Sequence, residues 1–178
     1  MKKIIPFILL AFLAIKLSAT TVNYSELVSI SDTMCLKTTK KPFTGKAVMN
    51  FPNGKISTET NYVNGLPNGL ETIYFENGNK FMQSNLKNGK LHGIMREWYE
   101  NGQMKSEVSY VTDYMFGACT RWYENGQKSE QGEYHHCKEK GIWTYWHENG
   151  QKSSEGEYNE AQKVGVWKNW DEKGKPIE

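Results

Sequence analysis

Three consecutive residues of this sequence have side chains that can bind a metal ion. His135, His136 and Cys137 are followed by His147, and imidazole and thiolate are ligands of zinc and copper. Consecutive residues of a strand point to opposite faces, so only a loop would let all three face one ion. No second cysteine or histidine pair stands at a usual ligand spacing. We therefore expect an exposed turn here, with no metal site and no cofactor.

Four glutamates recur at one spacing and could pair as the acid and base of a hydrolase. They are Glu76, Glu100, Glu124 and Glu148, each 24 residues from the next. Equivalent positions in successive hairpins lie two strands apart, about 9.6 Å, and an exposed turn excludes no water. No serine, cysteine or lysine stands in a context that would activate it as a nucleophile. We expect turn stabilisation from these glutamates, no catalytic residues and no enzymatic activity.

Aromatic side chains are the best candidates for binding. A row of tryptophan and tyrosine on an open sheet can stack on sugars, cover a protein partner or rest at lipid headgroups. The candidate binding residues are Trp98, Trp122, Trp146, Trp167, Trp170, Tyr99 and Tyr123. The alternative is that the rings only stabilise the sheet, and we favour it for most of them. Trp167 and Trp170, expected as exposed rings at the end of the array, are the exceptions.

Two ladders of glycine at a constant spacing of 24 show that the chain is a repeat array. One ladder comprises Gly54, Gly78, Gly102, Gly126, Gly150 and Gly174, and the other Gly45, Gly69, Gly93, Gly117, Gly141 and Gly165. The predicted repeats are 45–68, 69–92, 93–116, 117–140, 141–164 and 165–178. Such an array grows along one axis, so its length counts repeats rather than domains.

Each repeat is predicted to be one β-hairpin, because Asn-Gly between strand-forming residues favours a type I′ turn. With Asn125 and Gly126 as the two turn residues, Tyr123 pairs with Lys128 and Trp122 with Ser129. The same register sets one tyrosine or leucine opposite each of the first five glycines of the second ladder, namely Tyr62, Leu86, Tyr110, Tyr134 and Tyr158. A ring over glycine shields backbone from water, which we take as the reason for both ladders.

The expected fold is all-β: an elongated, antiparallel, largely single-layer sheet of tandem 24-residue hairpins. Side chains alternate between faces, so Trp98, Trp122, Trp146 and Trp170 line one face and Phe51, Phe75, Tyr99 and Tyr123 the other. Asn64-Gly65 and Asn88-Gly89 predict a second tight turn between hairpins. The later equivalents are Thr112-Asp113, His136-Cys137 and Glu160-Ala161, where we expect that turn chemistry to be lost.

Residues 1–19 have the layout of a cleaved secretory signal peptide, with two lysines before an apolar run too short to span a bilayer. We expect export to the periplasm, the cell surface or the medium. Residues 20–44 precede the repeats and are predicted to form a β cap, with short strands on either side of Ser31 and Asp32.

The net charge argues against nucleic-acid binding, and the cysteine count argues against a disulfide framework. The leader holds three lysines and no acid, so the rest of the chain has 19 basic and 20 acidic residues and a net charge of −1. That balance lacks the positive surface that nucleic acid requires. Three cysteines are an odd number, so disulfides do not hold this fold, although a bridge between Cys119 and Cys137 stays open.

The repeat resembles a known type. The unit of glycine, six residues and Glu-Asn-Gly-Gln, the run Asn88-Gly89-Lys90-Leu91-His92-Gly93 and the start Lys41-Pro42-Phe43-Thr44-Gly45 are similar to the bacterial MORN-variant repeat over residues 42–178. Proteins of this kind are often labelled YwqK-type antitoxins, and some relatives are exported. Related eukaryotic repeats occur beside phosphoinositide kinase domains and in membrane-junction proteins, which implies lipid or protein contact. This chain has no kinase motif.

Three hypotheses for function follow. The first is an exported, non-enzymatic scaffold that binds an unidentified protein partner at the cell envelope. The second is a peripheral binder of membrane lipid or glycan surfaces, which would use the aromatic columns directly. The third is an antitoxin-like protein, which would have to meet its toxin in the same compartment and therefore outside the cytoplasm.

Overall fold

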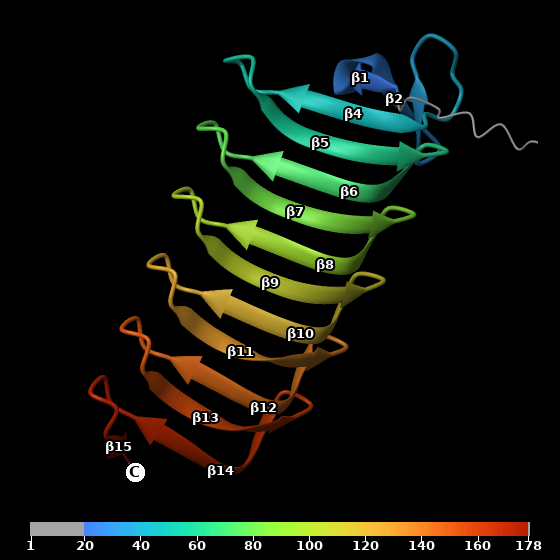
Figure 1. Ribbon diagram of the computed structural model, residues 1–178. Helices are drawn as coiled ribbons and strands as arrows, with labels where there is room; N and C mark the ends of the chain where they lie inside the picture. The colour runs from blue at the N-terminus through green and yellow to red at the C-terminus, as the bar shows by residue number, and fades with distance from the viewer. Residues whose placement is uncertain (1–19, 178) are drawn as a thin grey trace, which may run out of the picture.

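The chain folds into consecutive β-hairpins stacked side by side (Figure 1). The computed structural model describes residues 20–177. The predicted signal peptide, residues 1–19, lies outside the described residues. The strands are β1 (Thr21–Asn23), β2 (Leu27–Ile30), β3 (Thr33–Leu36), β4 (Gly45–Asn50), β5 (Ile56–Val63), β6 (Leu66–Tyr74), β7 (Lys80–Lys87), β8 (Lys90–Trp98), β9 (Met104–Val111), β10 (Tyr114–Trp122), β11 (Lys128–His135), β12 (Lys138–Trp146), β13 (Lys152–Asn159), β14 (Gln162–Trp170) and β15 (Pro176–Ile177).

The predicted fold class is confirmed. Strands β4 to β15 pair antiparallel in sequence order, and β1 adds to β4 in parallel, which gives one sheet of 13 strands. The hairpin β2-β3 forms a separate two-stranded sheet, and the one helix described is the 3₁₀ turn η1 (Tyr24–Glu26). Within residues 20–177, no helix is long and apolar enough to cross a membrane.

The Glu-Asn-Gly turns differ from the predicted type I′ turns. In the turn between β10 and β11, the Gly126 amide donates to the Tyr123 carbonyl (2.9 Å) and Gly126 has φ +85°, but Asn125 is not left-handed. This is a type I turn followed by a left-handed glycine, which forms a bulge. The bulge moves the pairing by one residue, so Trp122 lies opposite Lys128, and the predicted pairs of Trp122 with Ser129 and Tyr123 with Lys128 are wrong.

Asparagine stabilises these turns because its side chain makes two hydrogen bonds. Asn125 Oδ1 accepts the Gln127 amide (2.9 Å), and Asn125 Nδ2 donates to the Glu148 carbonyl in the next repeat (2.6 Å). Donation from turn to turn recurs at Asn77, Asn101 and Asn149. The asparagines therefore join one repeat to the next along this edge.

The opposite edge carries the two-residue turns with both residues left-handed, and here the sequence prediction is wrong. Thr112-Asp113, His136-Cys137 and Glu160-Ala161 all have positive φ, between 50° and 69°. Asp113 Oδ1 accepts the Leu91 amide (2.8 Å) and Cys137 Sγ accepts the Met115 amide (3.3 Å). These bonds offset part of the strain of a left-handed residue. Ala161 has no side-chain acceptor to do the same.

We therefore predict that Ala161→Gly stabilises the protein. Alanine at φ +68° carries a steric strain of about 1 kcal/mol that glycine relieves. The measurement is the free energy of unfolding in urea. The control is Ala118→Gly in the middle of β10, where glycine gains nothing and should destabilise by about 0.5–1 kcal/mol. Equal effects of the two substitutions would contradict the assignment of strain to the turn.

The predicted register across the second glycine ladder is confirmed. Gly45, Gly69, Gly93, Gly117 and Gly141 lie opposite Tyr62, Leu86, Tyr110, Tyr134 and Tyr158. Backbone conformation gives a direct reason for these glycines, since each has a positive φ. At Gly117, with φ +98°, the pairing of β10 with β9 shifts between Met115 and Cys119.

The buried interior consists of two small clusters. In the N-terminal cap, Val22, Leu27 and Phe43 pack with residues of the first hairpin. The expected strands on either side of Ser31 and Asp32 are present as β2 and β3. The second cluster contains Val108, Cys119, Tyr134 and Trp143.

One pair of facing positions on neighbouring strands recurs every 24 residues in the middle of the sheet, and a larger residue at one position goes with a smaller residue at the other. The position pairs are Thr60/Glu71, Ser84/Met95, Val108/Cys119, Gly132/Trp143 and Gly156/Trp167. A Cβ at Gly132 would lie 2.3 Å from the Trp143 ring, and one at Gly156 would lie 2.3 Å from the Trp167 ring. Tryptophan therefore occupies this position only where its neighbour has no side chain.

Candidate interaction surface

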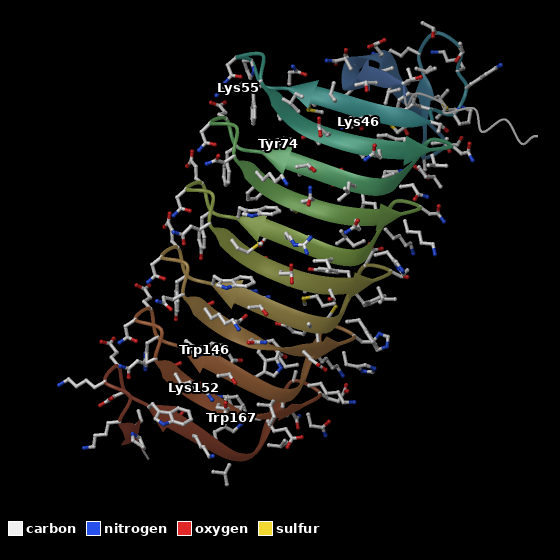
Figure 2. The ribbon with its side chains drawn as sticks, in the orientation of Figure 1. Lys46, Lys55, Tyr74, Trp146, Lys152 and Trp167 are labelled. Carbon is white, nitrogen blue, oxygen red and sulfur yellow. The ribbon has the colours of Figure 1, made fainter. Side chains whose placement is uncertain are left out.

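A column of tryptophans crosses the sheet beside the Glu-Asn-Gly turns. Trp98, Trp122 and Trp146 lie opposite Met104, Lys128 and Lys152, and Trp170 lies opposite Pro176. Figure 2 shows Trp146 and Lys152 near the turns of this edge. We call the column the tryptophan ladder, defined by Trp98, Trp122, Trp146, Trp170, Lys80, Met104, Lys128 and Lys152. Successive tryptophans stand on alternate strands, about 9.6 Å apart.

Lysines cover the ring faces of this ladder. The ammonium of Lys80 lies 5.4 Å from the ring centre of Trp98, and that of Lys128 lies 5.7 Å from Trp146. Lys152 lies 5.9 Å from Trp170 in the same way. Each contact is a cation-π interaction, worth about 0.5–1 kcal/mol at an exposed site. The four tryptophans are half-buried, so ring edges reach the surface while three of the rings have an ammonium over one face.

Four indole N–H groups remain available for binding. Among residues 20–177, the nitrogens of Trp98, Trp122, Trp146 and Trp170 donate to no protein acceptor and are not enclosed. By contrast, Trp143 donates to the Glu133 carbonyl (3.2 Å). The ladder therefore presents a row of hydrogen-bond donors set among apolar ring edges, which is a surface suited to a protein partner.

Tyr99 and Tyr123 bind the neighbouring repeat. The Tyr99 hydroxyl donates to the Trp122 carbonyl (2.8 Å), and the Tyr123 hydroxyl donates to the Trp146 carbonyl (2.7 Å). His147 Nε2 lies 2.9 Å from the Trp170 carbonyl at the equivalent place. Burial, with the charges of Glu124 and Glu148, raises the pKa of Tyr99, so it stays a neutral donor at physiological pH. These tyrosines stabilise the array, because each one bonds to the backbone carbonyl of a ladder tryptophan in the next repeat.

We predict that Tyr123→Phe lowers the free energy of unfolding by about 1 kcal/mol, because the Trp146 carbonyl loses its phenolic donor. Phe75 occupies the equivalent position in an earlier repeat, so the ring itself fits without a hydroxyl. Urea denaturation measures the change. A protein that binds the ladder should bind this variant as it binds the wild type, and a loss of binding at unchanged stability would assign Tyr123 to an interface instead.

The two other tryptophans lie away from the ladder. Trp167 is half-buried over Gly156 and contacts Tyr158 at 5.0 Å between ring centres, with Lys163 4.0 Å from its ring centre. The expected exposed ring at the end of the array is therefore a packed one. Trp143 is 1% exposed and is the largest fully buried side chain. Trp143 is not among the residues predicted from the sequence, although glycine at position 132 is a signal that could have identified a packed ring.

Of the residues considered for metal or acid-base chemistry, His135 and His136 are neighbours, with ring centres 4.7 Å apart, and the four glutamates lie in separate turns. Within the described part of the chain, no group of three or more histidine, cysteine or acidic side chains is placed to hold a metal ion. Glu76, Glu100, Glu124 and Glu148 are exposed, and their carbonyls face neighbouring turns. All three cysteines are free, so Cys119 and Cys137 do not pair. Burial raises the pKa of the Cys119 thiol, which disfavours the nucleophilic thiolate.

The fold and this surface define a tandem β-hairpin repeat protein with an open, side-chain-lined sheet. The chain belongs to the family described as MORN repeat variant, which matches residues 43–64, 67–88, 91–112, 117–136 and 139–160. Repeats of this family are generally non-catalytic and mediate contacts with proteins or membranes. A comparison with curated proteins finds no match.

Proposed function

We propose that this protein is an exported, non-enzymatic scaffold that binds another protein at the cell envelope through the tryptophan ladder. The observation that carries the proposal is the row of unpaired indole N–H groups along the sheet. Aromatic residues with a free polar group are enriched in protein interfaces, where the ring supplies buried area and the N–H fixes orientation. The layout of residues 1–19 supports export.

A binder of glycan or lipid surfaces is the second candidate, and the aromatic column itself favours it. Stacking on a sugar requires an open ring face. Lys80, Lys128 and Lys152 each lie over such a face, so a protein partner fits the ladder better. The antitoxin-like hypothesis is a special case of protein binding, in which the partner is an exported toxin.

The test begins with fractionation of the producing cell and mass spectrometry of the mature N-terminus and of co-purified proteins. A mature start at Thr20 outside the cytoplasm, with one stoichiometric protein bound, is the expected result. An uncleaved Met1 in the cytoplasmic fraction would contradict export. A bound protein that kills the cell when expressed without this chain would identify the antitoxin-like role.

The surface is then tested with the charge-neutral double variant Trp122→Ala and Trp146→Ala. The matched control is Ile142→Ala, which removes an exposed apolar side chain from the same strand as Trp146. We expect the tryptophan variant to lose the partner and the isoleucine variant to retain it, with circular dichroism confirming that both fold. Binding of vesicles or polysaccharide without any protein partner would favour the second candidate.

A further inference from the structure

The edge opposite the tryptophan ladder carries a second surface that departs from the repeat pattern. There the two-residue turns stack on one another, since the second residue of each turn donates its amide to the preceding hairpin, as Cys137 does to Met115 (3.0 Å). Figure 1 shows these turns lying along one side of the sheet. Several residues that flank these turns are exposed, among them Val111, Tyr114 and Phe116, whereas Met115 packs against the second cluster.

Exposed rings gather at the turns between β9 and β10 and between β11 and β12. We call Val111, Tyr114, Phe116, His135 and His136 the tip patch. Tyr114 is 55% exposed and Phe116 is 39% exposed. The Phe116 ring lies 4.9 Å from that of His135 and 5.6 Å from that of His136, between ring centres. Lys138 and Lys140 occupy the positions of Tyr114 and Phe116 one repeat later, so the fold does not require rings here.

A basic groove adjoins the tip patch on its N-terminal side. Its volume is about 320 Å³, and it is lined by Lys87, Asn88, Lys90, His92 and Thr112. Lys87 and Lys90 lie directly opposite each other across the turn, an arrangement of like charges that destabilises a hairpin. Within residues 20–177 neither lysine forms an ion pair.

Nearby carboxylates of the described residues form no ion pair with Lys87 or Lys90. Asp113, in the neighbouring turn, uses Oδ1 to accept the Leu91 amide (2.8 Å). Glu160 lies 3.2 Å from Lys138 Nζ and 3.9 Å from His135 Nδ1, on the side of the tip patch away from the groove. The groove therefore keeps two unpaired ammonium groups beside a cluster of exposed rings, which is complementary to carboxylates next to an apolar side chain.

We infer that these hairpin tips bind an acidic protein segment that carries an aromatic or large apolar anchor. Carboxylates of the segment contact Lys87 and Lys90 in the groove, and the anchor packs on Tyr114 and Phe116. An extended chain can enter a groove, whereas a flat bilayer cannot, so a protein segment fits better than a membrane surface. This site lies on the opposite edge from the tryptophan ladder and does not depend on it.

Three synthetic peptides test the inference on the full protein. The first alternates Asp and Glu around two Phe anchors, the second replaces the acids by Lys, and the third replaces the anchors by Ser. Fluorescence anisotropy measures binding, and amide chemical shifts locate it. We expect only the first peptide to bind, with weaker binding at high salt and with shifts at residues 87–92 and 111–117. Equal binding of all three, or shifts elsewhere, would overturn the proposal.

Variants can be taken from the equivalent positions of other repeats, so folding is preserved. Tyr114→Gln with Phe116→Asn copies Gln162 and Asn68, and Lys87→Asn with Lys90→Gln copies Asn159 and Gln162. Each pair should weaken the first peptide by about tenfold or more, as loss of central anchors does. The last measurement is binding of the protein and both variants to vesicles of phosphatidylserine. Vesicle binding that both variants abolish, without any peptide binding, would assign the site to a membrane and overturn the inference.

Discussion

Replacing Gly132 by valine is expected to destabilise the C-terminal half of the sheet by about 3–5 kcal/mol, as much as removing a buried tryptophan. A Cβ at position 132 would lie 2.3 Å from Cδ2 and Cε2 of Trp143. The strand backbone cannot move away without breaking its hydrogen bonds to the neighbouring strands. Trp143 is 1% exposed and contacts Tyr134 at 5.0 Å between ring centres. The clash therefore displaces the largest side chain of the second cluster.

Trp143→Cys alone should destabilise the protein as much as Gly132→Val does. The two substitutions together should compensate for each other. Trp143→Cys leaves a cavity beside Gly132, with an expected loss of similar size. The double variant Gly132→Val and Trp143→Cys reproduces the pair Val108 and Cys119, which already packs two strands away. We expect its stability to return to within about 1.5 kcal/mol of the wild type, as for volume-conserving exchanges.

Chemical denaturation of the four proteins gives this coupling as a double-mutant cycle. Hydrogen exchange should localise the loss in the single variants to β10 to β14 and leave the cap protected, because a repeat array transmits instability mainly to its neighbours. If the two single effects simply add in the double variant, the size match between the paired positions does not control packing.

The period of the array could be predicted from the sequence, because glycine and asparagine have backbone preferences that act within a few residues. Register followed from the same turns, and the pairing of Gly117 with Tyr134 is as expected. The type of turn could not be predicted in the same way. Asn-Gly suits a type I′ turn and also a type I turn with a bulge, and the hydrogen bond from Asn125 to the next repeat favours the second.

The turns of the opposite edge could not be predicted for a related reason. Propensity argues against left-handed threonine and alanine. Stacking of each turn on the preceding hairpin holds these residues in that conformation, as the bond from the Ala161 amide to the Glu139 carbonyl (3.0 Å) illustrates. Contacts between repeats thus override local preference at positions such as Glu160 and Ala161.

The candidate surface was predictable in its residues but not in its geometry. Trp122 and Trp146 stand out from their spacing alone, yet the lysine over the Trp146 ring depends on the bulge that brings Lys128 beside the tryptophans. The Tyr123 hydroxyl donates to the Trp146 carbonyl, and the residue pattern does not predict this hydrogen bond. The outer edges of the indoles, and not the tyrosines, are therefore the candidate binding groups.

Phe43→Ala is predicted to open the N-terminal end of the array and to cause self-association. Phe43 is 2% exposed and packs against Tyr62 at 6.0 Å between ring centres, and its carbonyl accepts the Gly65 amide (2.7 Å). Loss of the ring should cost about 3–5 kcal/mol of cap stability. The strand β1, which pairs with β4 at three residues, would then detach and expose β4 as an edge.

An exposed edge strand recruits other strands, so a shift from monomer to larger species should accompany the loss of stability. Light scattering after size exclusion measures the association, and hydrogen exchange should show lost protection in β4 with unchanged protection in β12 to β14. The control is Phe51→Ala, which removes a half-buried phenylalanine of the first repeat at the far edge of the sheet from the cap. Because Phe51 lies outside the cap cluster, its loss should leave β1 in place. Association caused equally by both variants would show that general destabilisation, and not the uncovered edge of β4, drives it.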